Sequence, residues 1–104
     1  EEGEPLELID LLRQMERKPQ LFLGSDDIFA LRHSLSGYIM AEKEHDPAYH
    51  DWLFSGFPSY LSQLYRDDRA LDWAALINLH EPDGDPVAAF FRLAHRYYET
   101  LQPR

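Results

Sequence analysis

Histidine and carboxylate side chains in two short segments are the groups of this sequence best suited to hold a metal ion. The first cluster consists of His45, Asp46, His50 and Asp51. Metal ligands on one helix recur at three or four residues, whereas these two histidines are five residues apart. Pro47 also marks a helix start between them. The spacing therefore does not favour a metal site.

The second segment with this composition is also a poor metal site. It consists of His80, Glu81, Asp83 and Asp85. A calcium loop needs oxygen ligands at ordered spacings and a terminal Glu, and both are missing here. Surface histidines and helix-capping aspartates account for both clusters, so we expect no metal and no cofactor.

The sequence shows no recognisable catalytic arrangement. The serines are Ser25, Ser34, Ser36, Ser55, Ser59 and Ser62. None has the context of a nucleophile elbow, and Gly24 belongs to no phosphate-binding glycine loop. Cysteine is absent, which excludes disulfides, thiolate zinc sites and thiol catalysis and favours a reducing compartment. We therefore expect a cytoplasmic protein that is not an enzyme; a catalytic site assembled from distant positions is the alternative.

The charge balance limits the classes of partner. Nineteen acidic residues against ten Lys and Arg give a net charge of -9. Phosphate backbones and anionic lipids need a cationic surface, so nucleic acid and membrane are not expected as partners. No apolar run approaches the roughly 20 residues of a membrane span, and no signal-peptide pattern opens the sequence. A basic protein would be attracted by the same charge.

Most of the acidic excess falls in two segments, 42–51 and 67–85, which carry -3 and -5. Their acidic residues are Glu42, Glu44, Asp46, Asp51, Asp67, Asp68, Asp72, Glu81, Asp83 and Asp85. Because both segments fall at predicted helix ends and loops, we expect these side chains on the surface, near Tyr49, Tyr60 or Tyr65. Acidic residues around exposed aromatic rings are typical of a protein-binding surface. The alternative is a solvated surface whose carboxylates only cap helices.

Helical periods and turn residues divide the chain into its elements. Apolar residues recurring at three and four predict helices over about 5–17, 58–65 and 71–79. Ser25 is the expected N-cap of another helix, and Asp-Pro pairs at 46–47 and 85–86 are expected to open two more. Gly37, inside one helix, indicates either a close neighbour or simple tolerance. The predicted fold is all-α, a compact single domain over 1–104 of five or six helices in an orthogonal or bundle-like array.

The stretch from Arg17 to Gly24, RKPQLFLG, is followed by a helix with Leu35, Gly37 and Tyr38. It resembles a pattern in small bacterial proteins, R-x-R-P-x-hydrophobic-aromatic-hydrophobic-G and then a helix ending L-x-G-Y. The segment 49–53, YHDWL, and the aromatic last helix around Phe90 also resemble that group. Two residues depart from the pattern: Lys18 replaces arginine and Phe22 replaces tyrosine.

The group is similar to the immunity proteins of bacterial toxin systems, which neutralise a cognate toxin by binding it in the cytoplasm. The resemblance implies partner binding and carries no catalytic residue or binding site with it. A charge of -9 fits a basic toxin domain such as a nuclease. Two other functions stay open: a small regulatory or adaptor module, and a helical domain with a ligand pocket. The pocket would show as a void among aromatic residues, namely Tyr38, Trp52, Trp73, Phe90 and Tyr97, whereas we expect a filled core.

Overall fold

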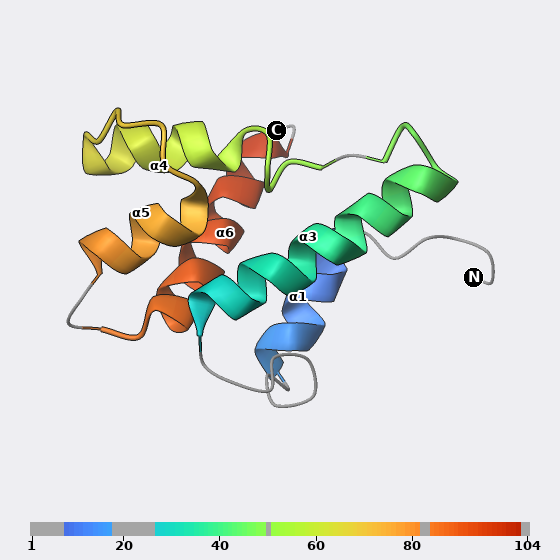
Figure 1. Cartoon of the computed structure of the whole chain (residues 1–104), viewed down its shortest axis with the longest axis horizontal. Coiled ribbons are helices and arrows are strands. Elements are labelled where there is room, and N and C mark those ends of the chain that lie inside the picture. The colour runs from blue at the N-terminus through green and yellow to red at the C-terminus, as the bar shows by residue number, and fades with distance from the viewer. Residues whose placement is uncertain (1–7, 18–26, 50, 82–83, 103–104) are drawn as a thin grey trace.

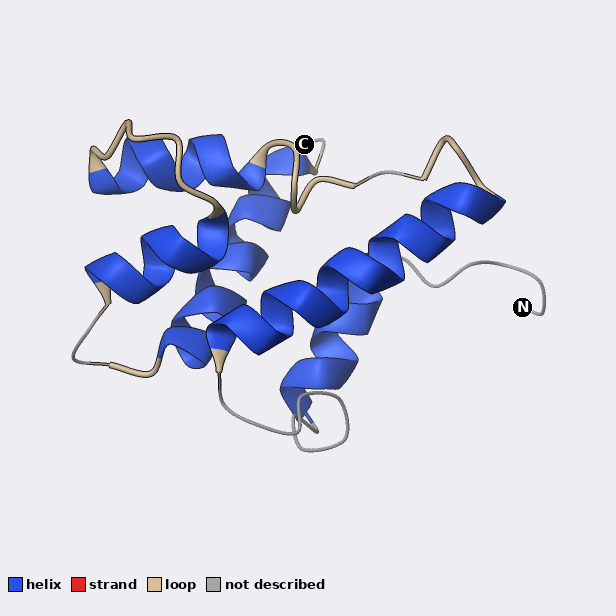
Figure 2. Cartoon of the chain, viewed as in Figure 1, coloured by secondary structure: helices blue, strands red, loops and turns tan. Residues whose placement is uncertain are grey.

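Helices make up most of the residues that the structure describes, and no strand occurs in that part of the chain (Figure 2). The computed structural model describes residues 8–17, 27–49, 51–81 and 84–102. Its helices are α1 (Leu8–Arg17), α3 (Ile28–His45), α4 (Phe57–Tyr65), α5 (Trp73–His80) and α6 (Pro86–Leu101). The predicted all-α class is confirmed. None of these helices is long and apolar enough to cross a membrane.

Helix α6 lies at the centre of the array and contacts each of the other four described helices. Helix α3 crosses the molecule diagonally, and its C-terminal end extends away from the other helices (Figure 1). Helices α4 and α5 pack together and run in the same general direction, because the chain over 66–72 passes back along α4 before α5 begins (Figure 1). The C-terminal ends of α4 and α5 therefore meet.

Aspartate caps set where three helices begin. The carboxylate of Asp85 accepts hydrogen bonds from the backbone N–H groups of Val87 and Ala88, so the predicted start of the last helix is confirmed. Asp72 caps α5 in the same way. The cap of α3 is Asp27, two residues beyond the predicted cap Ser25, which lies outside the described residues.

The prediction that a helix opens at Asp46 is wrong. Helix α3 continues to His45 and Asp46 is its C-cap, although the Asp46 carboxylate still accepts from the N–H of Ala48. Between α3 and α4 the described residues form only turns, at 47–48 and 53–56. The Asp51 carboxylate opens the second turn by accepting from the N–H groups at 53 and 54. At the end of this turn the N–H groups of Gly56 and Phe57 both donate to the carbonyl of Trp52. The regular helix α4 begins at Phe57.

Aromatic rings from three segments fill the centre of the core. Trp73, Phe57 and Phe90 have no exposed surface. The Trp73 ring stacks on Phe90 with 4.5 Å between centroids, and Phe57 meets Phe90 edge-on at 6.0 Å. Trp52 lies 5.9 Å from Tyr97. Rings that could have bordered a void therefore pack against each other.

Two glycines have opposite surroundings. Gly37 is exposed and has open space where a Cβ would be, so simple tolerance is the right interpretation of this residue. At Gly56 a Cβ would collide with the hydroxyl end of Tyr97, which comes from α6. Close approach is therefore found at Gly56, immediately before α4.

Candidate functional site

The acidic residues predicted to bind a partner differ in what their carboxylates contact. Nine of the ten are described, and Asp83 lies outside the described residues. Four cap backbone N–H groups: Asp46, Asp51, Asp72 and Asp85. Asp51 is mostly buried, with 8% of its side chain exposed, and it pairs with Lys43 at 3.3 Å. Its predicted place on the open surface is therefore wrong, since its carboxylate is used to form the turn before α4.

Asp67 is the clearest departure from the predicted acidic surface. It is 7% exposed, the one buried polar residue among those described. Its carboxylate accepts from the backbone N–H of Arg69 at 3.2 Å and from Arg69 Nε at 2.9 Å, and it lies 2.8 Å from His80 Nε2. The hydrogen bonds from Arg69 and then from His80 hold the pKa of Asp67 well below its usual range. The prediction that Asp67 is exposed is wrong.

The buried carboxylate belongs to a polar network that joins three helices. The ring of Tyr65, at the end of α4, stacks on that of His80, at the end of α5, with centroids 4.4 Å apart. The Tyr65 hydroxyl donates to Glu81 at 3.0 Å, and Arg92 from α6 lies 3.9 Å from the same carboxylate. Burial, and then the bond to Glu81, raise the pKa of Tyr65. Glu81 is therefore used to hold the helix ends together.

Two of the predicted acidic residues remain without such a use. Glu42 interacts electrostatically with Tyr38, whose pKa is raised first by burial and then by this carboxylate. Glu44 and Asp68 are exposed and form no hydrogen bond or ion pair with the described part of the chain. Asp68 does interact electrostatically with the Arg69 guanidinium. These two carboxylates are the ones available to a partner.

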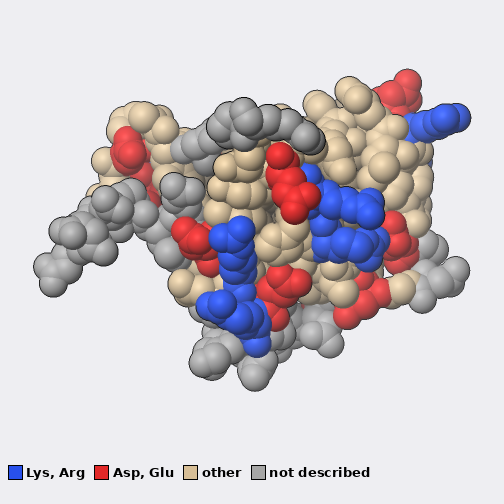
Figure 3. Space-filling view, turned by 180° about the vertical axis from the view of Figure 1, so that it is seen from behind, with Lys and Arg blue, Asp and Glu red and all other residues tan. Residues whose placement is uncertain are grey.

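The surface charge is mixed. The described ranges hold 13 of the 19 acidic residues and 8 of the 10 Lys and Arg, a net charge of -5. On the face turned away from the viewer in Figure 1, basic side chains gather next to acidic ones (Figure 3). This face is therefore not uniformly acidic.

Apolar side chains are exposed on the outer side of α3. Met40 is 64% exposed, the highest value among the large apolar residues described, and Phe29 on the same helix is 41% exposed. Glu44 follows Met40 by four residues, so the two side chains share one face of the helix. We call Met40, Glu44 and the intervening turn the α3 end surface. It combines an apolar contact with a free negative charge.

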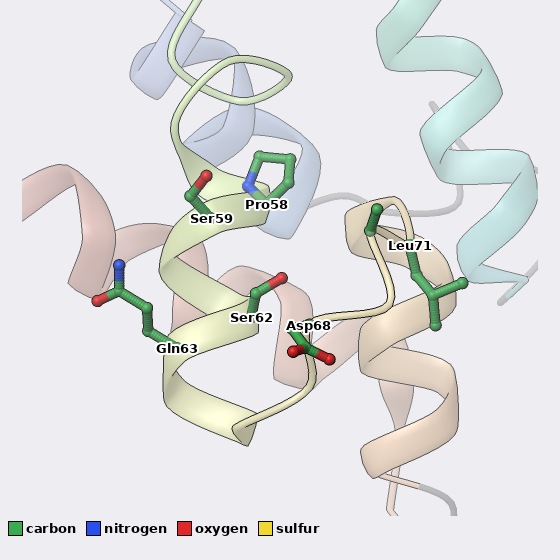
Figure 4. Close-up of a pocket in the computed structure, with 7 residues that line it drawn as sticks. Pro58, Ser59, Ser62, Gln63, Asp68 and Leu71 are labelled. Atoms are coloured by element: carbon green, nitrogen blue, oxygen red, sulfur yellow. The ribbon is translucent and has the colours of Figure 1, made fainter.

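A groove of about 470 Å³ lies between α4 and the returning chain that precedes α5 (Figure 4). It is lined by Pro58, Ser59, Ser62, Gln63, Asp68, Ala70 and Leu71. Only Asp68 had been predicted as a site residue. Ser59 and Ser62, spaced by three on α4, were a weak sequence signal for a polar helix face.

The described side chains form no metal-binding cluster. Among the described residues, no three side chains of His, Asp or Glu lie close enough to share a metal ion. His50 and Asp83, which belong to the two clusters in the sequence, lie outside those residues. Comparison with protein-family models, curated proteins and solved structures finds no match to this chain.

Proposed function

We propose that this chain is an immunity protein, which binds a cognate toxin protein in the bacterial cytoplasm and covers the toxin's active site. The observation that carries the proposal is the α3 end surface. There Met40, an apolar side chain 64% exposed, lies one helical turn from Glu44, whose carboxylate has no partner in the described chain. The surface is carried on the end of a helix that projects from the other helices (Figure 1).

Physical chemistry favours a protein as the partner of such a surface. Burying an exposed Met side chain contributes roughly 1.5 to 3 kcal/mol, and methionine adapts its shape to the surface that covers it. A free carboxylate beside it accelerates association with a basic protein and adds little to affinity in water. The apolar side chain would therefore slow dissociation of the complex, and the charge would speed its association.

A small regulatory or adaptor module would use the same surface on a different protein. The neighbouring genes distinguish the two functions, because an adjacent toxin gene supports immunity and a regulated operon supports an adaptor. A ligand-binding domain has less support, since Trp73 and Phe90 stack on each other in the core.

The test is co-expression with the product of the adjacent gene. We expect a stable 1:1 complex at modest salt and rescue of cell growth when that product is toxic. Met40→Ser and Glu44→Gln should weaken rescue while leaving the helical circular dichroism spectrum unchanged. Glu99→Gln is the matched control, because Glu99 is an exposed carboxylate on α6. Absence of a complex, or equal rescue by all variants, would contradict the proposal.

A further inference from the structure

The groove between α4 and residues 68–71 has one charged group, and that group forms no hydrogen bond or ion pair with the described chain. Its lining includes no Lys or Arg, and its single carboxylate is Asp68. In Figure 4 the Ser62 hydroxyl, on α4, and the Asp68 carboxylate, on the facing chain, both lie between the two segments. A groove with this lining attracts a cation and disfavours an anion.

The neighbouring residue explains why Asp68 forms no ion pair, although the Arg69 guanidinium still interacts with it electrostatically. Arg69, the nearest cation in the sequence, donates to Asp67 from its backbone N–H and from Nε and Nη2 of its guanidinium. The turn is completed by Arg66 and Ala70, which both have positive φ, 55° and 64°. Because Arg69 is committed to Asp67, Asp68 is left exposed with no hydrogen bond or ion pair to the described chain.

We infer that this groove receives an arginine side chain from a basic segment of the partner protein. The inference rests on the proposed function, because it names a surface that would contact the toxin. The volume of about 470 Å³ lies within the range of roughly 300 to 1,000 Å³ found for ligand pockets. It therefore has room for a side chain and part of its backbone.

The chemistry of the lining selects arginine. A guanidinium has five donors in a rigid fork, and the acceptors that lie between the two segments are the Asp68 carboxylate and the Ser62 hydroxyl (Figure 4). The aliphatic stem of arginine can pack on Pro58 and Leu71. A lysine has only three donors on a compact, strongly hydrated ammonium, so it uses fewer of these acceptors.

The binding test uses nuclear magnetic resonance of the full chain labelled with ¹⁵N. The probe is acetyl-Gly-Arg-Gly-amide, and its neutral counterpart has citrulline in place of arginine. We expect the arginine peptide to shift the amide signals of Ser59, Ser62 and Asp68, with weak affinity because the pair is exposed. Asp68→Asn should weaken binding roughly two- to fivefold, as expected for loss of one exposed ion pair.

Asp72→Asn is the matched control, because it removes a nearby negative charge outside the groove lining while asparagine can still cap α5. Its affinity for the arginine peptide should stay close to that of the unmodified chain. Equal shifts with the citrulline peptide, or no shifts in the groove, would overturn the inference. A lysine peptide that binds as tightly would overturn the choice of arginine.

Failure of this inference can be told apart from failure of the proposed function. A toxin complex that forms normally with the Asp68→Asn variant leaves immunity intact and overturns the role of the groove. Binding of the arginine peptide in the groove without any toxin complex supports the groove and contradicts immunity.

Discussion

Asp67 and Asp68 are adjacent acidic residues with opposite roles. Asp67 is buried and bonded to Arg69 and His80, whereas Asp68 is exposed in the groove. Nothing in their residue types separates them, because the difference comes from the turn at 66–70 and from a histidine 13 residues away. A charge-reversal experiment aimed at the partner should therefore change Asp68 and leave Asp67 in place.

The low pKa of Asp67 predicts how stability depends on pH. A carboxyl whose pKa is lower in the folded than in the unfolded chain stabilises the fold above its ordinary pKa of 3.8. This stabilisation is lost as the pH falls below that value towards the folded-state pKa. Below about pH 4, Asp67→Asn should reduce the slope of the unfolding free energy against pH. The reduction should correspond to at most about one proton fewer taken up on unfolding.

Urea unfolding between pH 2 and 5 measures this slope. Asp68→Asn is the control, because that carboxylate has no hydrogen bond in the described chain, and its slope should stay close to that of the parent. Identical slopes for the parent and Asp67→Asn would show that the buried contacts of Asp67 do not stabilise its charged form.

The two glycines predict substitutions of opposite sign. Gly37→Ala should stabilise the fold by about 0.5 to 1 kcal/mol, because the site is exposed, helical and open. Gly56→Ala should destabilise it by about 1 to 3 kcal/mol, since the new methyl group meets Tyr97. Thermal and urea unfolding provide both values.

Adding Tyr97→Phe to Gly56→Ala isolates the cause of the second effect. The change removes the hydroxyl that the methyl group meets first and leaves a ring carbon at 3.1 Å. The double variant should therefore lose less stability than the sum of the two single changes. Simple additivity would place the cost of Gly56→Ala elsewhere.

At the scale of elements, local signals were informative where capping and periodicity agreed. The pair Asp85-Pro86 starts α6 as predicted, and the long apolar period that follows it is buried against the core. The same signal failed at Asp46-Pro47, because the preceding helix already ends there and Asp46 can bond the N–H of Ala48 in a turn. An Asp-Pro pair indicates a change of direction, and the surrounding chain decides whether a helix follows.

Helix capping predicts which acidic residues contribute to stability. Asp85→Ala should destabilise the fold by about 1 kcal/mol, because it leaves the N–H groups of Val87 and Ala88 without their acceptor. Asp68→Ala should change stability by less than about 0.5 kcal/mol, as usual for an exposed residue without such contacts. Urea unfolding compares the two variants. An equal loss of stability from both would contradict the distinction between the helix-capping Asp85 and the exposed Asp68.

At the scale of the whole molecule, aromatic packing determines which residues are available for binding. Trp73 is fully buried, and its indole N–H has no hydrogen-bond partner in the described structure. Its contribution is therefore expected from ring packing against Phe57 and Phe90. Trp73→Ala should cost about 3 to 5 kcal/mol, and Trp73→Phe clearly less, because a ring remains and no hydrogen bond is lost. Equal losses in thermal unfolding would contradict this account.

The predicted acidic surface was only partly recoverable from the sequence. Composition predicted where negative charge is dense, but the ten residues included helix caps and the buried Asp67, whose roles depend on tertiary contacts. The projecting end of α3, with Met40 exposed, also depends on how α3 packs, because periodicity alone does not say where a helix leaves the core.

The most direct test is the association rate of this chain with the toxin that we propose as its partner, measured by stopped-flow fluorescence over a range of salt concentrations. One double variant, Glu44→Gln with Asp68→Asn, removes the two carboxylates of the predicted set that have no hydrogen bond or ion pair in the described chain. A second double variant, Asp72→Asn with Asp85→Asn, also removes two negative charges. Its changes fall at helix N-caps, where asparagine can take the place of aspartate. The first should associate more slowly, with a flatter salt dependence, than the second. Equal rates for the two variants would contradict the assignment of Glu44 and Asp68 to the partner.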